Sequence, residues 1–115
     1  KSDVISCHVP LTDETYHIID AAAISKMRTG TILINASRGG VLDEAAVIDS
    51  LKSGKLGGAA IDVFEKEPID ATSGAAFVDV PNFLITPHVA WATDEANVMT
   101  DDVTVTNIRR VLANG

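Results

Sequence analysis

Three polar residues with complementary chemistry follow three successive apolar runs of this chain. Arg38 follows the run TILINAS, Glu67 comes soon after GGAAIDVF, and His88 follows NFLITP. If each run is a strand of one parallel sheet, all three side chains emerge at its carboxyl edge, where ligands bind in open α/β sheets. A guanidinium, a carboxylate and an imidazole at that edge predict anion binding coupled to proton transfer.

The residue types assign a distinct task to each of the three. An imidazole acting near neutral pH needs a partner that fixes its tautomer and stabilises its charged form. Glu67 is a suitable partner for His88, but Glu65 competes with it, and spacing alone does not separate the two. Arg38 precedes two glycines, and its planar fork matches a carboxylate bidentately. A carboxylate held beside an imidazole predicts a 2-hydroxy acid, or the corresponding 2-keto acid, as ligand.

Asp62 is an acid inside an otherwise apolar run, AAIDVF. Burying a carboxylate there is costly unless it is well hydrogen-bonded. Two interpretations stay open: a satisfied structural aspartate, or an acceptor for a ligand amide such as a nicotinamide carboxamide. His8 ends a predicted strand, so we expect it to line the site without reacting, and we expect His17 to be structural.

Apolar runs and capping residues predict the elements that position this site. Asp20 and Asp43 are predicted N-caps, and Gly30 and Gly54 are predicted stops. Strands alternating with helices favour parallel pairing with crossover helices. The small residues of the run 57–64 predict close approach by a helix or a ligand. Strands are predicted at 3–8, 31–36, 57–64 and 82–86; helices at 21–27, 44–54 and from 93 or 94 to about 114, the last with an apolar stripe of Val98, Val105, Ile108 and Leu112; and residues 65–81 form a long connection with one helical turn.

Composition narrows the class of protein. The 115 residues carry a net charge of −7 and have a pI near 4.7. Without a basic patch, binding to nucleic acid is not expected. We see no membrane-length apolar run, signal-peptide pattern or metal-ligand motif. The lone Cys7 cannot form an internal disulfide, which favours a reducing, cytoplasmic setting, and we expect it in the core. The chain enters a predicted strand almost at Lys1, as if partway through a fold.

Four segments together resemble one enzyme family. VISCHVPLTDET, TILINASRGGVLDE, GGAAIDVFEKEP and PNFLITPHVAWAT, in this order, resemble the D-isomer-specific 2-hydroxyacid dehydrogenases over nearly the whole chain. The resemblance implies an oxidoreductase in which Arg38 clamps the substrate carboxylate, Glu67 polarises the imidazole and His88 is the general acid/base. It also favours Glu67 over Glu65. Formate oxidation is disfavoured, because related formate dehydrogenases carry glutamine at the position of Glu67.

The same resemblance implies a nicotinamide cofactor, NAD, with NADP left open. Trp91 beside the catalytic histidine resembles members that act on glycerate and hydroxypyruvate. The cofactor contacts that the resemblance implies are Val9, Pro10, Ala36, Ser37, Arg38, Asp62, His88, Ala90 and Trp91.

Two hallmarks of the family's cofactor domain do not occur in this sequence. These are the glycine-rich G-x-G-x-x-G turn and the acidic residue that follows it for the adenosine ribose. Residues 1–115 are therefore expected to form the second half of a Rossmann-like doubly wound parallel sheet with flanking helices, without the glycine-rich half or the substrate domain. We expect the isolated chain to be inactive and its parent to be a homodimer.

Two other readings stay open. The chain could belong to a non-catalytic NAD(H)-sensing module of the corepressor type, which keeps the fold and the three polar residues. Alternatively, Arg38, Glu67 and His88 could be separate, individually satisfied residues.

Overall fold

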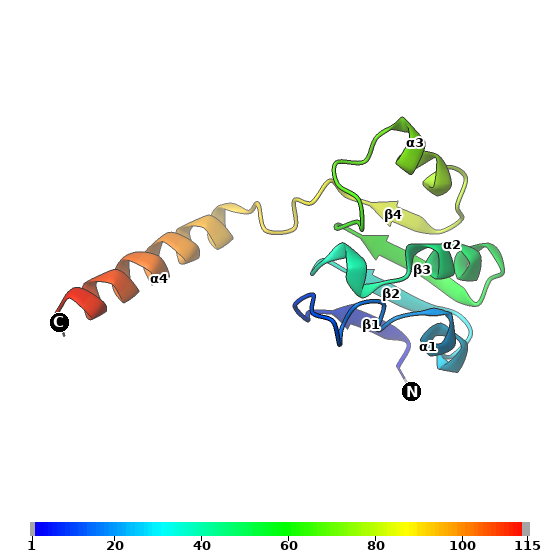
Figure 1. The fold of residues 1–115 in the computed structure, drawn as a ribbon, viewed down its shortest axis with the longest axis horizontal. Coiled ribbons are helices and arrows are strands. Elements are labelled where there is room, and N and C mark those ends of the chain that lie inside the picture. The colour runs from blue at the N-terminus through cyan, green and yellow to red at the C-terminus, as the bar shows by residue number, and fades with distance from the viewer. Residues whose placement is uncertain (1, 114–115) are drawn as a thin grey trace.

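The computed structural model describes residues 2–113 and shows four parallel strands in one sheet (Figure 1). The strand order β1-β2-β3-β4 follows the chain. The predicted α/β class with parallel pairing is confirmed. The strands are β1 (Val4–Cys7), β2 (Thr31–Asn35), β3 (Leu56–Ile61) and β4 (Phe83–Ile85); the α-helices are α1 (Ala21–Lys26), α2 (Glu44–Lys52), α3 (Ala71–Gly74) and α4 (Asp94–Ala113); and short 3-10 helices η1 (Gly39–Val41) and η2 (Ala75–Phe77) follow β2 and α3.

The helices between the strands begin where the sequence predicts. The Asp20 carboxylate accepts a hydrogen bond from the Ala23 N–H at 2.7 Å, and the Asp43 carboxylate accepts one from Ala46 at 3.0 Å. Each bond satisfies a backbone donor of the first turn that has no partner within the helix. Gly54, just beyond α2, has a φ of 73°, the left-handed conformation that glycine adopts without strain.

The third strand is shorter than predicted at its carboxyl end. Pairing stops at Ile61, yet residues 62–64 stay buried. The apolar run continues as a packed loop, in which the Phe64 ring lies 5.1 Å from that of Phe77, centroid to centroid. The apolar character of Val63 and Phe64 therefore indicates that they pack in the core, not that they pair in a strand.

Gly57 is small for a different reason from the one predicted. A Cβ atom at this position would overlap the backbone carbonyl group of Gly30. The close neighbour of Gly57 is thus the turn that leads into β2, whereas the prediction for the run 57–64 named a helix or a ligand.

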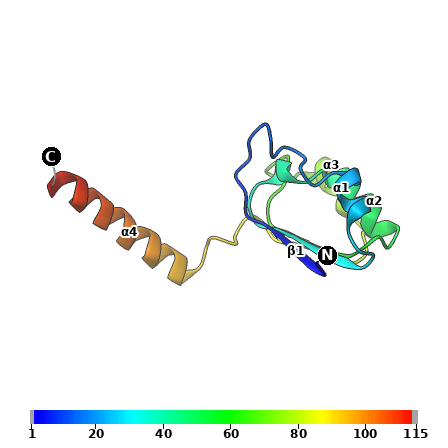
Figure 2. The same cartoon turned by 90° about the horizontal axis from the view of Figure 1, so that it is seen from below.

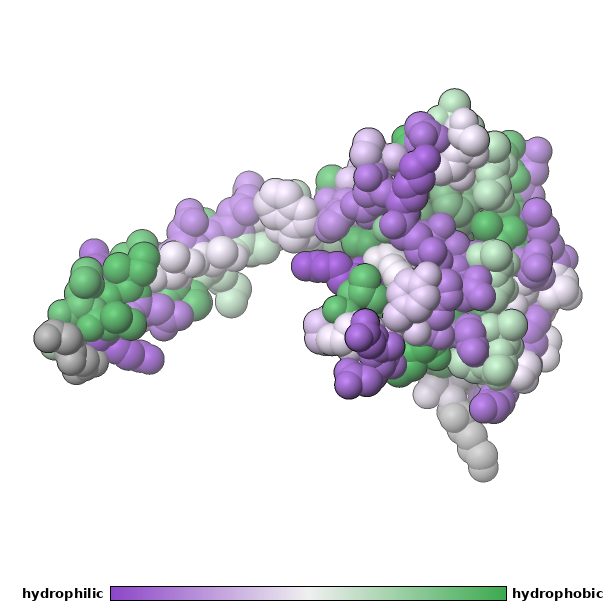
Figure 3. All heavy atoms as spheres, in the orientation of Figure 1, coloured by the Kyte–Doolittle hydropathy of each residue, from purple (hydrophilic) through white to green (hydrophobic). Residues whose placement is uncertain are grey.

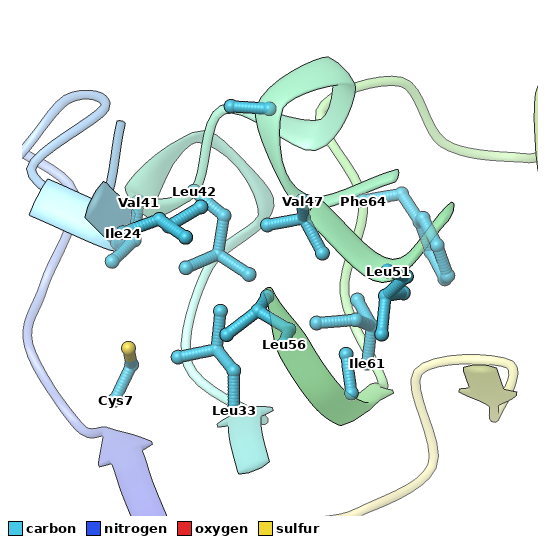
Figure 4. Packing of buried hydrophobic residues seen from close by; sticks show 12 residues of the cluster. Cys7, Ile24, Leu33, Val41, Leu42, Val47, Leu51, Leu56, Ile61 and Phe64 are labelled. Carbon is cyan, nitrogen blue, oxygen red and sulfur yellow. The ribbon is translucent and has the colours of Figure 1, made fainter. Parts of the chain in front are cut away.

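The core lies between the sheet and the helices. Figure 2 shows α1, α2 and α3 on one face of the sheet, and Figure 4 shows the apolar side chains packed beneath them, Cys7 among them as predicted. Among residues 2–113 no helix covers the opposite face, where Val4, Ile32 and Leu84 are 51%, 43% and 63% exposed. The largest fully buried side chains are Ile24, Leu33, Leu42, Leu56, Val41, Val47, Val63, Asn35 and Thr31.

Helix α4 has the predicted start, but within residues 2–113 its apolar stripe stays exposed. It projects away from the sheet (Figures 1 and 3), and Val98, Val105, Ile108 and Leu112 are 45% to 76% exposed. Asn114, the predicted last residue, lies outside the described residues. Within the described part of the chain, no helix combines the length and apolar character needed to cross a membrane.

Candidate active site

Parallel pairing places the three predicted catalytic residues on loops that leave the same edge of the sheet. Arg38 follows β2, Glu67 follows β3 and His88 follows β4, each beyond the carboxyl end of its strand. Figure 1 shows the three strand ends pointing to one side. The topology therefore fulfils the condition for a shared ligand edge.

Glu67 and His88 form a hydrogen-bonded pair. The Nδ1 atom of His88 lies 2.7 Å from Oε2 of Glu67, and the Phe64 N–H donates to Oε1 of Glu67 at 2.8 Å. These two hydrogen bonds hold the pKa of Glu67 below its ordinary value, and the bond with His88 has the larger effect. Since an ionised carboxylate only accepts, Nδ1 of His88 carries a proton, and Nε2 is left to face a ligand.

The loop that carries His88 is anchored on Asp62. Asp62 is 5% exposed, and its carboxylate accepts hydrogen bonds from the Thr86 hydroxyl and from the N–H groups of Val89 and Ala90, both at 2.9 Å. His88 itself has a φ of 57°, in the left-handed region that favours glycine. The surroundings must impose this conformation, and the three bonds to Asp62 flank it on both sides.

The structure shows the hydrogen bonds that the structural interpretation of Asp62 requires. Both carboxylate oxygens are engaged within the protein. Burial acts most strongly on the pKa of Asp62 and raises it, but the hydrogen bonds from Thr86, Ala90 and Val89 together bring it below its ordinary value. Asp62 thus holds the histidine loop, and the contact to the cofactor that the resemblance implies stays a prediction.

We expect Asp62→Asn to destabilise the protein by about 2 kcal/mol at pH 7, because the amide turns one acceptor into a donor facing N–H and O–H groups. A lowered folded-state pKa stabilises the protein above the unfolded-state pKa, and this stabilisation is lost as the pH falls through the folded-state value. The difference between wild type and variant should therefore shrink below about pH 4. Urea unfolding at pH 7 and pH 3 measures it, and a difference independent of pH would contradict this role for the carboxylate.

Arg38 lies on a turn that is held by Asn35, a residue that the sequence motifs did not single out. Asn35, fully buried at the end of β2, donates from its side chain to the Arg38 carbonyl at 2.9 Å and accepts from the N–H and hydroxyl of Ser37. A buried asparagine ending a strand is the signal that could have identified it. The exposed Arg38 guanidinium donates to the Ser37 carbonyl at 2.7 Å and has no carboxylate partner among residues 2–113.

Two open clefts lie at this edge, and they divide the predicted site. Glu67 and His88 line one of about 610 Å³, together with apolar groups such as Phe64 and Ile85. Arg38 lines the other, of about 460 Å³. The remaining residues of this second cleft are His8, Val9, Pro10, Leu11, Ala36 and Ser37.

The predicted cofactor contacts separate in the same way. Five of them line the second cleft: Val9, Pro10, Ala36, Ser37 and Arg38. Two others, Asp62 and Ala90, are joined by a hydrogen bond from the Ala90 N–H to the Asp62 carboxylate. Trp91 is 63% exposed, and its indole N–H donates to the His88 carbonyl at 3.0 Å. His8 lines the second cleft, as expected, and its Nε2 atom lies 2.8 Å from the Ser6 hydroxyl.

Glu65, the other candidate for the partner of His88, contacts a different histidine. Its Oε1 atom lies 2.9 Å from Nε2 of His17. The two glutamates of the EKEP segment thus serve two different histidines, and it is Glu67 that contacts His88.

Comparison with known proteins identifies the family. The family described as D-isomer specific 2-hydroxyacid dehydrogenase, NAD binding domain, matches residues 1–90. The chain belongs to this family. The shared segment contains β1 to β4 and all three predicted catalytic residues, so the resemblance stated from the sequence motifs is confirmed.

Curated relatives of this dehydrogenase family are similar over almost the whole chain. A glycerate dehydrogenase of Methylorubrum extorquens is 45% identical over 113 residues, which cover 98% of this chain and 36% of the relative. An (S)-sulfolactate dehydrogenase of Chromohalobacter salexigens is 46% identical, covering 97% and 36%. The chain therefore spans about a third of the length of the curated relatives it matches.

Solved structures of the family share the fold. A D-lactate dehydrogenase from Aquifex aeolicus, solved with NAD and lactic acid, gives a TM-score of 0.78 at 34% identity, over 98% of this chain and 38% of that one. The holo D-mandelate dehydrogenase of Rhodotorula graminis gives 0.81 at 35% identity, over 95% and 31%. The Rossmann-like assignment is confirmed, while the named substrates of these proteins differ widely.

Proposed function

We propose that this chain is the second half of the NAD-binding domain of a longer D-2-hydroxyacid dehydrogenase, called the parent enzyme below. The observation that carries the proposal is the 2.7 Å contact between Glu67 and His88 at the carboxyl edge of a sheet of this family. The relatives named above are dehydrogenases, which favours an enzyme over the sensing module.

Each catalytic residue has a defined task in this reaction. Arg38, with no carboxylate partner among residues 2–113, binds the carboxylate of the 2-keto acid bidentately. When bound, a nicotinamide cofactor supplies the hydride to C2 in reduction or accepts it in oxidation. His88 gives the proton on Nε2 to the substrate oxygen during reduction and takes it back during oxidation. Glu67 keeps Nδ1 protonated and stabilises the charged imidazole.

The cleft beside Arg38 fits the nicotinamide half of such a cofactor. Apolar groups of Val9, Pro10, Leu11 and Ala36 line it together with the polar side chains of His8, Ser37 and Arg38. A flat aromatic ring with polar substituents needs this combination of surfaces. No glycine-rich phosphate turn occurs among the 115 residues, so the pyrophosphate would have to be held elsewhere in the parent enzyme.

Uncovered apolar surfaces support a larger parent. The sheet face that bears Val4, Ile32 and Leu84 and the exposed stripe of α4 are apolar. Such surfaces are normally covered by further protein. We propose that the remaining domains and a second copy of the parent enzyme cover them, and that the parent is a cytoplasmic homodimer acting on glycerate or hydroxypyruvate, with NAD preferred and NADP left open.

The proposal predicts that the 115-residue chain alone does not turn over and binds NADH only at about 1 mM or more. Trp91 is the sole tryptophan and adjoins His88, so quenching of its fluorescence by NADH measures binding. Assays of the chain and of the parent enzyme with glyoxylate, hydroxypyruvate and pyruvate measure turnover. Robust turnover by the chain alone would show that the rest of the parent is unnecessary, and a parent inactive on all three acids would contradict the proposed substrates.

A further inference from the structure

A second histidine–carboxylate pair lies next to the catalytic one. His17 and Glu65 are 48 residues apart in sequence, and Nε2 of the histidine is 2.9 Å from Oε1 of the glutamate. Both side chains are about 30% exposed. The His17 ring also stacks on Tyr16, with ring centroids 4.0 Å apart, and the His17 N–H donates to the Gly40 carbonyl at 2.8 Å. His17 therefore joins the segment after β1 to the turn after β2.

Glu65 is also bound to the first turn of α2. The Glu65 N–H donates to Oε1 of Glu44 at 2.6 Å, and the Glu44 N–H lies 3.4 Å from Oε1 of Glu65. Burial, more than any other influence, raises the pKa of Glu44, and the nearby charge of Glu65 acts in the same direction. The backbone and the side chain of Glu65 are thus both engaged, by two separate segments of the chain.

This clamp, defined as His17, Glu44 and Glu65, sits directly beside the catalytic pair. Glu65 is two residues before Glu67 and follows Phe64, whose N–H donates to Glu67. The backbone of residues 64–65 also packs against Gly39, the neighbour of Arg38. The loop of the catalytic glutamate is therefore in contact with both the clamp and the turn that carries Arg38.

We propose that Glu65 is a positioning residue that fixes the Glu67–His88 pair relative to Arg38 by tying the Glu67 loop to His17 and to the start of α2. The inference rests on the proposed function. Contacts between partly exposed charged groups add little to folding stability, whereas a displacement of about 1 Å at a reacting group costs about a hundredfold in rate. Glu65 should therefore matter more for kcat than for stability.

Kinetics of the parent enzyme with Glu65→Ala and Glu65→Gln test the inference. We expect Glu65→Ala to lower kcat about 30-fold while the dissociation constant of NADH stays within about twofold. Glu65→Gln keeps an acceptor oxygen for His17 and for the Glu44 N–H, so it should restore kcat to within about threefold of wild type. Lys66→Ala, which removes the exposed contact to Asp70 at 3.2 Å in the same loop, is the matched control and should stay within about twofold.

A double-mutant cycle separates positioning from a general structural role. If Glu65 acts through Glu67, then Glu65→Ala should cost almost nothing further in a Glu67→Ala background, where no side chain links the loop to His88. A full additional loss there, or a lower melting temperature with unchanged kcat per active site, would overturn the inference. If Glu67→Ala itself leaves kcat unchanged, the proposed function fails; if Glu67→Ala is impaired and Glu65→Ala is not, only the positioning role fails.

Discussion

Replacing His88 by alanine in the parent enzyme is expected to lower kcat for 2-keto acid reduction about 10³-fold. The variant loses the group that protonates the substrate oxygen, and no other histidine among residues 2–113 takes its place. His8 is bonded to Ser6 and His17 to Glu65. Steady-state kinetics with hydroxypyruvate and NADH, at saturating concentrations of both, measure the loss.

Glu67→Gln provides the graded comparison for that experiment. The amide can still accept from Nδ1 of His88 but no longer carries the charge that stabilises the imidazolium, so kcat should fall about 10-fold to 100-fold. The dissociation constant of NADH should change much less than kcat in both variants. A His88→Ala protein that keeps wild-type turnover would exclude the proposed acid/base role. If the parent were instead a sensing module, its response to NADH would survive the substitution.

The order and pairing of the elements were predictable from local patterns. The β-branched run 31–36 and the N-caps Asp20 and Asp43 depend only on residues close to them in sequence, so they could be predicted from the sequence. Parallel pairing then follows from the strand–helix alternation and places Arg38, Glu67 and His88 at one edge. This much of the site is a consequence of topology.

The contacts within the site were less predictable because they depend on loops. The chain has three histidines, and the EKEP segment has two glutamates, so several histidine–glutamate pairings were possible. The path of the chain after β3 decides that Glu67 contacts His88 and Glu65 contacts His17. The role of Asp62 was likewise open, since its partners come from the loop after β4, 24 to 28 residues away. The stripe of α4 indicated a packed helix, but helical periodicity does not identify the surface that covers it.

The turn that carries Arg38 and the loop that carries Glu67 are in contact at Gly39. A Cβ atom at this position would lie well inside 3.0 Å of the Phe64 carbonyl group and of the Glu65 amide nitrogen. These neighbours are backbone atoms at the end of the buried run 62–64, and packed backbone has little freedom to move away. Gly40 differs, because the nearest atoms to a Cβ there are side-chain atoms of Leu11 and Tyr16, at 3.3 Å.

Gly39→Ala is therefore expected to destabilise the parent enzyme by about 3 kcal/mol or more and to abolish measurable turnover. The added methyl group must push the Phe64–Glu65 backbone away, and this displaces both the Glu65 clamp and the N–H that Phe64 gives to Glu67. Gly40→Ala is the matched control, with a loss of about 1 kcal/mol and retained activity, since the flexible side chains of Leu11 and Tyr16 can rotate aside. Thermal unfolding and kcat are to be measured for both variants. Equal losses in the two proteins would show that the contact at Gly39 has no special part in joining the carboxylate-binding arginine to the histidine–glutamate pair.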